Sequence, residues 1–147
     1  MNDITGIDSN IFVYAADKTS GRYIEASRII SDAALGKVRA VIVPQNLTEY
    51  YATVTNSKKV PIPMTNKTAI DQMEKLLRSS LKLVYPNNRT TKLFIELLGL
   101  VGVKAQRVYD IFLAATLLSN GIRTLITENK EDFAGIKDLK TIDLSEW

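Results

Sequence analysis

Two hydrophobic patterns alternate along the chain, one of strand length and one with helical spacing. Short apolar runs bounded by turn residues predict β-strands, and they fall at 4–8, 40–43, 82–85, 123–127 and 140–142. Apolar residues with a period near 3.6 predict helices, first through Phe12 and Val13 and then at 22–35, 44–56, 65–80, 90–100 and 107–120. Strands that alternate with helices of this length are typical of a parallel sheet covered by helices. We therefore predict an α/β fold with about four to five parallel strands flanked by helices on both faces.

The organisation of the chain predicts a single domain over residues 1–147. This length suits one hydrophobic core, and no repeat or long linker divides it. We expect the helices between residues 65 and 100 to form an arm or lid beside the sheet. The longest apolar run, 111–118, is too short to span a bilayer. The opening Met1-Asn2-Asp3 shows no basic or apolar signal segment, so we expect a cytoplasmic protein with no membrane segment.

Four polar and acidic clusters occur just after a predicted strand or in the opening turns of a predicted helix. They are Asp8, Glu49, Asp110 and the segment 127–132, which contains Glu128, Asn129 and Asp132. In a parallel sheet the carboxyl ends of the strands share one edge, where ligands of such sheets bind. Gathered carboxylates repel one another unless a cation lies among them. The pattern therefore predicts a Mg²⁺ or Mn²⁺ site, since these ions prefer oxygen ligands.

Each cluster also has a purely structural interpretation. Asp8 could cap the helix that follows it, and residues 128–132 could form an ordinary acidic turn. Glu49 lies nearly opposite the apolar stripe of its helix, which favours an exposed glutamate. Asp110 begins a helix that is apolar almost all round and therefore buried. A carboxylate at the end of such a helix is expected at a cleft.

Composition narrows the possible chemistry. The chain contains no cysteine and no histidine, which excludes disulfides, thiol nucleophiles, Cys/His zinc sites and Ser-His-Asp triads. An enzyme built from this chain must use carboxylates, hydroxyls, Lys, Arg, Tyr or a hard metal ion. The net charge of +3 and pI near 9.1 suit a polyanionic ligand, although charge alone is a weak indicator.

Taken together, the clusters resemble the PIN-domain ribonucleases, and particularly the VapC-type toxins of prokaryotic toxin–antitoxin pairs. The resemblance covers nearly the whole chain. Its pieces are the opening segment 7–14, Thr48-Glu49 on the second main helix, the segment 109–115, and the stretch from Ile126 to Phe133. Each piece alone is weak, but their order and spacing are fairly specific.

The resemblance implies the roles of individual side chains. The metal-binding and catalytic acids of the family correspond to Asp8, Glu49 and Asp110. The fourth acidic position corresponds to Asn129, and Asp132 could supply the charge that an asparagine lacks. Ser9 and Thr127 match positions that support the site through hydroxyl contacts. The implied reaction is endonucleolytic hydrolysis of RNA by metal-activated water, with one tight metal and a second that binds mainly with substrate.

Basic residues are candidates for contact with the substrate phosphate. Arg107 has the best claim because it lies one helical turn before Asp110. The others are Lys18, Arg22, Lys58 and Lys59, for most of which solvated surface charge is the simpler interpretation.

The resemblance also implies partners, namely an RNA substrate, a cognate antitoxin protein that covers the cleft, and a second copy of the chain in a homodimer. Two alternatives stay open. One is a PIN-domain nuclease of RNA processing without an antitoxin. The other is a PIN-like module that binds RNA or a partner without cutting, which the asparagine at position 129 favours. A haloacid-dehalogenase-like phosphatase needs a second aspartate where Asn10 stands.

Overall fold

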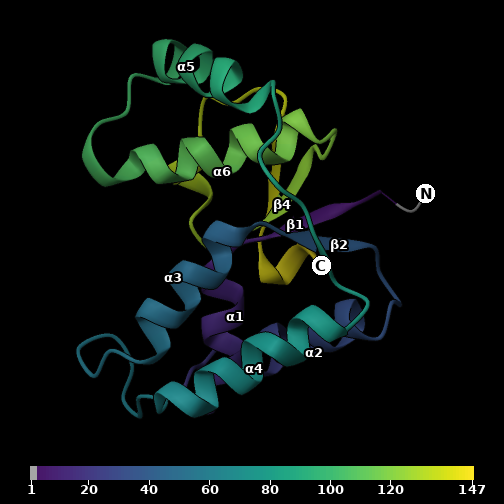
Figure 1. Ribbon diagram of the computed structural model, residues 1–147, viewed down its shortest axis with the longest axis vertical. Helices are drawn as coiled ribbons and strands as arrows, with labels where there is room; N and C mark the ends of the chain where they lie inside the picture. The colour runs from purple at the N-terminus through teal and green to yellow at the C-terminus, as the bar shows by residue number, and fades with distance from the viewer. Residues whose placement is uncertain (1–2) are drawn as a thin grey trace.

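A five-stranded sheet, parallel throughout, forms the centre of the computed structural model, which describes residues 3–147 (Figure 1). The strand order is β3-β2-β1-β4-β5, and the strands are β1 (Thr5–Ile7), β2 (Ala40–Ile42), β3 (Lys82–Leu83), β4 (Thr124–Ile126) and β5 (Lys140–Ile142). The predicted α/β fold with a parallel sheet is confirmed. Met1 and Asn2, which belong to the opening segment expected to carry no signal peptide, lie outside the described residues.

Helices occupy the segments that showed helical spacing. They are α1 (Ser9–Ala16), α2 (Tyr23–Ala34), α3 (Pro44–Val54), α4 (Asn66–Arg78), α5 (Thr90–Val101) and α6 (Val108–Ser119). Three short 3-10 turns complete the described chain, namely η1 (Ala105–Arg107), η2 (Lys130–Phe133) and η3 (Leu144–Glu146). Pro44 begins α3, where the absence of a backbone N–H costs nothing.

Alternation along the strands divides the core between the two faces of the sheet. In β2, Ala40 and Ile42 belong to one buried cluster with residues of α1, α2, α3 and α4. Val41, between them, belongs to a second cluster with residues of α5 and α6. Successive side chains of a strand point to opposite faces, so α1 to α4 cover one face and α5 and α6 cover the other (Figure 1).

A glycine on the central strand allows the buried helix α6 to lie close to the sheet. Gly6 faces α6, and a Cβ atom at this position would lie 2.8 Å from a methyl carbon of Leu117. Real Cβ atoms do not approach other carbons so closely, so a larger residue would require the Leu117 side chain, or α6 itself, to shift. The position of α6 matters because its first turn carries Asp110.

The expectation that the helices between residues 65 and 100 form an arm is wrong. Strand β3 lies between them and pairs with β2 in the sheet. Helix α4 packs on α3, whereas α5 packs along α6 on the opposite face. The two helices therefore belong to different layers. No helix within residues 3–147 combines the length and the apolar composition needed to cross a membrane.

Candidate functional site

A hollow of about 600 Å³ lies at the carboxyl edge of the sheet. We call it the acidic hollow, after its four carboxylates Asp8, Glu49, Asp110 and Asp132. They come from segments far apart in the sequence: the end of β1, helix α3, the first turn of α6 and the turn η2. The remaining lining residues are Ser9, Asn10, Val13, Tyr14, Thr53, Lys59, Gln106, Arg107, Tyr109 and Asn129.

Asp8 both caps a helix and lines the hollow. It ends β1 in extended backbone and accepts a hydrogen bond from the backbone N–H of Ser9 at 2.7 Å, at the start of α1. Its second oxygen accepts from the hydroxyl of Thr127 at 2.7 Å. Asp8 is 7% exposed and Thr127 is fully buried. The capping interpretation and the site interpretation of Asp8 are therefore compatible.

Glu49 is half-buried, and hydrogen bonds hold it toward the hollow. One carboxylate oxygen accepts from the Ser9 hydroxyl at 2.6 Å, and the other accepts from the side-chain amide of Gln45 at 2.7 Å. Its position opposite the apolar stripe of α3 indicated a solvent-exposed side chain. The stripe locates only the core, however, and the opposite face of α3 here borders α1 and the start of α6.

The sequence did not single out two asparagines that hydrogen-bond to residues of the site. Asn46 is 1% exposed; it accepts from the Val43 N–H at 2.9 Å and donates to the Ser9 hydroxyl at 3.1 Å. Asn10 donates weakly to Thr127 at 3.4 Å, and its buried carbonyl oxygen has no hydrogen-bond partner. In the sequence, only the place of Asn10 in the segment 7–14 could have indicated its role. For Asn46, only its position near the start of a helix could have done so.

Burial and mutual repulsion raise the pKa of two of the acids. Burial raises the pKa of Asp8 to about 6, against the lowering effect of its bonds from Thr127 and Ser9. Burial, together with the negative charges of Asp8, Asp132 and Glu49, raises the pKa of Asp110 to about 7. Groups with such shifted values are typical of functional sites, although structural networks also produce them.

The fourth cluster separates into residues that line the hollow and one that turns away. Asn129 and Asp132 line the hollow. Glu128 instead accepts from Arg22 Nε at 2.9 Å and from the backbone N–H of Leu144 at 2.8 Å. Glu128 therefore ties the loop before α2 to the C-terminal turn, and its carboxylate lies outside the hollow.

Two of the five candidate phosphate-binding residues line the acidic hollow, and three do not. Arg107 and Lys59 line the acidic hollow. Arg107 lies 3.7 Å from the Asp132 carboxylate and donates to the backbone carbonyl of Glu131 at 3.1 Å. Arg22 is engaged with Glu128, and Lys18 lines a different hollow. Lys58 is exposed and does not line the acidic hollow.

The donor atoms of the hollow fit a hard divalent cation. Within residues 3–147, no three acids are close enough together to enclose an ion directly. Mg²⁺, however, commonly binds through one or two carboxylates and keeps several waters, and a hollow of about 600 Å³ has room for them. The oxygen-only donor set and the unpartnered Asn10 carbonyl agree with such a hydrated ion.

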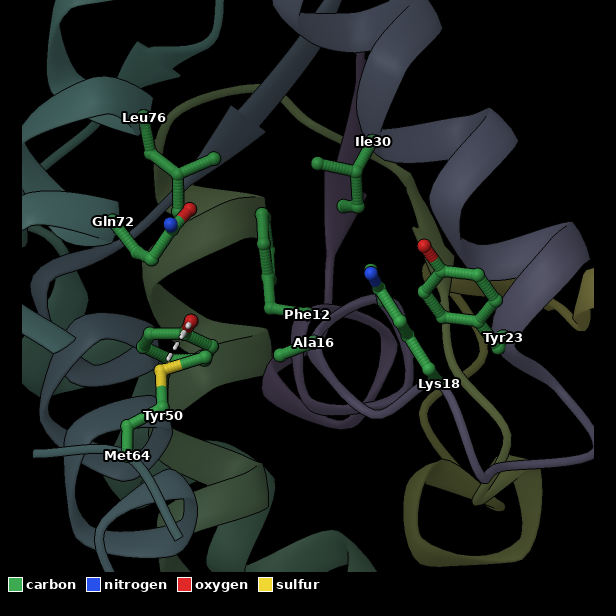
Figure 2. Close-up of a pocket in the computed structure, with 10 residues that line it drawn as sticks. Phe12, Ala16, Lys18, Tyr23, Ile30, Tyr50, Met64, Gln72 and Leu76 are labelled. Atoms are coloured by element: carbon green, nitrogen blue, oxygen red, sulfur yellow. Dashed lines mark hydrogen bonds between the residues drawn. The ribbon is translucent and has the colours of Figure 1, made fainter. Parts of the chain in front are cut away.

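A second hollow, of about 240 Å³, lies among α1, α2, α3 and α4. We call it the apolar hollow, and Figure 2 shows Phe12 at its centre, between Ile30 and Leu76. Its polar lining residues are Lys18, Tyr23, Tyr50 and Gln72. The Tyr50 hydroxyl donates to the sulfur of Met64 at 3.8 Å. No carboxylate lines it, so it lacks the anionic oxygen ligands that a divalent metal ion prefers.

Comparison with known proteins shows similarity in structure but not in sequence. No protein-family model matches the chain, and no curated protein matches it either. VapBC-1 from nontypeable Haemophilus influenzae is 23% identical, with a TM-score of 0.68, over 97% of this chain and 98% of that chain. VapBC2 from Rickettsia felis, bound to a DNA fragment from its promoter, is 21% identical, with a TM-score of 0.67, over 95% and 98%.

A third similar structure is VapC20 from Mycobacterium tuberculosis, a toxin that cleaves the sarcin-ricin loop. It is 10% identical, with a TM-score of 0.65, over 89% of this chain and 95% of that chain. Identities this low establish the fold alone. The resemblance inferred from the sequence is confirmed at that level, and the chain has the PIN-like α/β fold of the VapC proteins of toxin–antitoxin complexes.

Proposed function

We propose that the chain is a single PIN-like domain over residues 1–147 that acts in the cytoplasm as a metal-dependent endoribonuclease, the toxin of a toxin–antitoxin pair. One observation carries the proposal. Four carboxylates from separate segments line the same hollow, and in two of them burial and neighbouring charge raise the pKa toward neutrality. Buried carboxylates that repel one another resist ionisation, and a bound cation would stabilise their ionised forms.

Asp8, Glu49 and Asp110 would hold the hydrated metal ion, in part through its waters, with Asn129 or Asp132 at the fourth position. When bound, Mg²⁺ or Mn²⁺ supplies a Lewis acid that acidifies water and offsets the charge developing on a phosphate. Ser9 and Thr127 are supporting residues, because their hydroxyls donate to Glu49 and Asp8 and so fix the carboxylate orientations.

The substrate phosphate would be bound at the rim of the acidic hollow by Arg107. Its guanidinium is about half exposed, so it is available to a ligand that approaches from solvent. Lys59 lies in the loop between α3 and α4, far from Arg107 in the sequence. It lines the same hollow and adds a second positive charge. With a divalent cation bound, the two basic side chains and the ion would together offset the four acids, so that a phosphate could approach the hollow.

Two protein partners belong to the proposal. The matching chains of VapBC-1 and VapBC2 have the same fold as this chain and come from complexes with an antitoxin. This similarity supports a cognate antitoxin that covers the acidic hollow. A small open reading frame beside the gene is the expected genetic sign. An isolated gene would favour a PIN-domain RNA-processing nuclease instead.

The second protein partner is another copy of the chain. The apolar helix α6 is covered by α5 and the sheet, so it is not available for a homodimer. Helix α5 exposes Ile95 and Leu100 and is the apolar helix left to form one. We expect light scattering of the purified protein to give the mass of a dimer, and a monomer mass would remove this part of the proposal.

The decisive experiment measures cleavage of a panel of structured RNAs by the purified chain. We expect cleavage with Mg²⁺ or Mn²⁺, no cleavage with EDTA, and no cleavage by Asp110→Asn in either metal. Circular dichroism should show that the variant is folded. Cleavage in EDTA, or full cleavage by folded Asp110→Asn, would contradict the proposed metal site.

A PIN-like module that binds RNA without cutting it is the second candidate. Asn129 lies where a fourth acid is expected, and within residues 3–147 the acids do not converge on one point. Such a module would bind RNA from the same panel but would show no heat of Mn²⁺ binding in calorimetry and no cleavage.

A further inference from the structure

Gln45 makes two hydrogen bonds at the acidic hollow, although no role was assigned to it from the sequence. It lies in the first turn of α3. Its side-chain nitrogen donates to the Glu49 carboxylate at 2.7 Å and to the backbone carbonyl of Tyr109 at 3.0 Å. A primary amide has two N–H groups on one nitrogen, so both bonds can form at the same time.

The first bond orients a carboxylate. Gln45 and Glu49 are four residues apart on α3, a spacing that brings their side chains to the same helix face. Because Ser9 donates to the other oxygen of Glu49, both oxygens have fixed partners, one from α3 itself and one from α1. Glu49 is therefore held toward the hollow, although the apolar stripe of its helix points elsewhere.

The second bond joins two helices. Tyr109 lies in the first turn of α6, immediately before Asp110. Its ring is exposed, and its carbonyl is the atom that receives the bond from α3. Through one nitrogen atom, Gln45 thus links the helix that carries Glu49 to the turn that carries Asp110.

We propose that Gln45 is a positioning residue that sets the relative placement of Glu49 and Asp110 for a divalent cation. This inference rests on the proposed function, because it concerns the same site. Gln45 itself supplies no charge, and its N–H groups are committed to Glu49 and Tyr109. Partners that orient metal ligands typically change metal affinity by about 10–100-fold when they are removed.

The variant that tests this role is Gln45→Met, because methionine has similar length but no N–H donor. Gln45→Ala is the second variant. Thr48→Ala is the matched control, since Thr48 lies on the same helix, is exposed, and bonds only to the carbonyl of Pro44 at 3.3 Å. Full-length proteins are compared by calorimetry with Mn²⁺ and, without metal, by hydrogen exchange of peptides covering 105–113.

We expect Gln45→Met and Gln45→Ala to bind Mn²⁺ about tenfold more weakly and to exchange faster over 105–113, with Thr48→Ala like wild type in both measurements. Wild-type affinity in Gln45→Met would overturn the inference. So would faster exchange confined to 44–54, because that result describes a residue that only stabilises α3.

The two proposals fail differently. If the wild-type protein binds no Mn²⁺, the proposed function fails. The exchange of the metal-free variants over 105–113 then decides by itself whether Gln45 holds α6 to α3: faster exchange supports the tie, and unchanged exchange overturns it.

Discussion

Helices α1 and α3 contribute side chains to both the acidic hollow and the apolar hollow. The two hollows therefore share two helices but differ in the chemistry of their side chains. From α1, Asn10 and Tyr14 line the acidic hollow, whereas Phe12 and Ala16 line the apolar one. From α3, Glu49 and Tyr50 are adjacent in sequence but serve different hollows. Neighbouring positions of a helix point in directions about 100° apart, which allows one helix to border both.

The two hollows have opposite effects on stability. Burying the side chain of Phe12 removes apolar surface from water, which stabilises the fold. Burying the carboxylate of Asp8 opposes its charge, which raises its pKa to about 6 and destabilises the metal-free protein at neutral pH. A region lined by buried carboxylates therefore lacks the stabilisation that an apolar region provides. This contrast between the two hollows can be tested by substitution and by pH.

Removing one charge from the acidic hollow should abolish catalysis and leave the fold unchanged. We expect Asp8→Asn to reduce Mg²⁺-dependent RNA cleavage by at least about a hundredfold, because a ligand of the proposed ion is lost. The matched control is Asp71→Asn, the same chemical change at an aspartate of α4 that pairs with Lys67 on the protein surface. Equal loss in both variants would contradict a specific site.

Truncating the centre of the apolar hollow should affect folding more than any acid does. Phe12 is 4% exposed, so we expect Phe12→Ala to lower the free energy of unfolding by about 3 kcal/mol. Urea denaturation followed by circular dichroism measures this difference. Ile24→Ala on α2, where the side chain is 79% exposed, should change stability by less than about 0.5 kcal/mol. A small effect at Phe12 would show that this hollow contributes little to the core.

The raised pKa values of Asp8 and Asp110 should make the stability of the protein depend on pH. In the folded state the pKa of Asp8 is raised from 3.8 to about 6, and that of Asp110 from 3.8 to about 7. The folded state therefore binds these protons more tightly than the unfolded state does. The resulting contribution to the free energy of unfolding is complete below about pH 4 and is lost as the pH rises through 6 to 7.

We expect the free energy of unfolding, measured by urea denaturation in EDTA, to fall between about pH 5 and pH 7.5. At pH 7.5, Asp8→Asn should be more stable than wild type by on the order of 2 kcal/mol. Mn²⁺ should stabilise wild type more at pH 7.5 than at pH 5.5, since the carboxylates must be ionised to bind it. If Asp8→Asn is less stable than wild type throughout this range, the ionised Asp8 carboxylate does not destabilise the folded state.

The smallest expected effect distinguishes two lysines. Lys59 lines the acidic hollow and Lys18 lines the apolar one, although the sequence made them equal candidates for phosphate contact. We expect Lys59→Ala to raise KM for RNA about threefold, the magnitude of one exposed ionic contact, and Lys18→Ala to leave KM unchanged. Steady-state cleavage kinetics at constant salt measures both, and the opposite ranking would place the RNA path on the other side of α1.

Asp8 and Asp110 could be located from the sequence because their positions follow from local rules. One ends a buried strand and the other begins a buried helix, and in a parallel sheet those ends meet at one edge. The turn after β4 was harder, because adjacent residues there point in different directions. Asn129 lines the hollow, whereas Glu128 bonds to Arg22, more than 100 positions away in the chain.

The sequence by itself determined the order of strands and helices, the parallel sheet and the edge at which the acids gather. These features depend on hydrophobic period and on connection geometry, which are encoded within short windows of the chain. Only the tertiary structure decided that Glu49 faces the hollow, that Gln45 links it to the turn bearing Asp110, and that α4 and α5 lie on opposite faces. Those outcomes depend on hydrogen bonds and packing between segments distant in sequence, which no single helix or strand specifies.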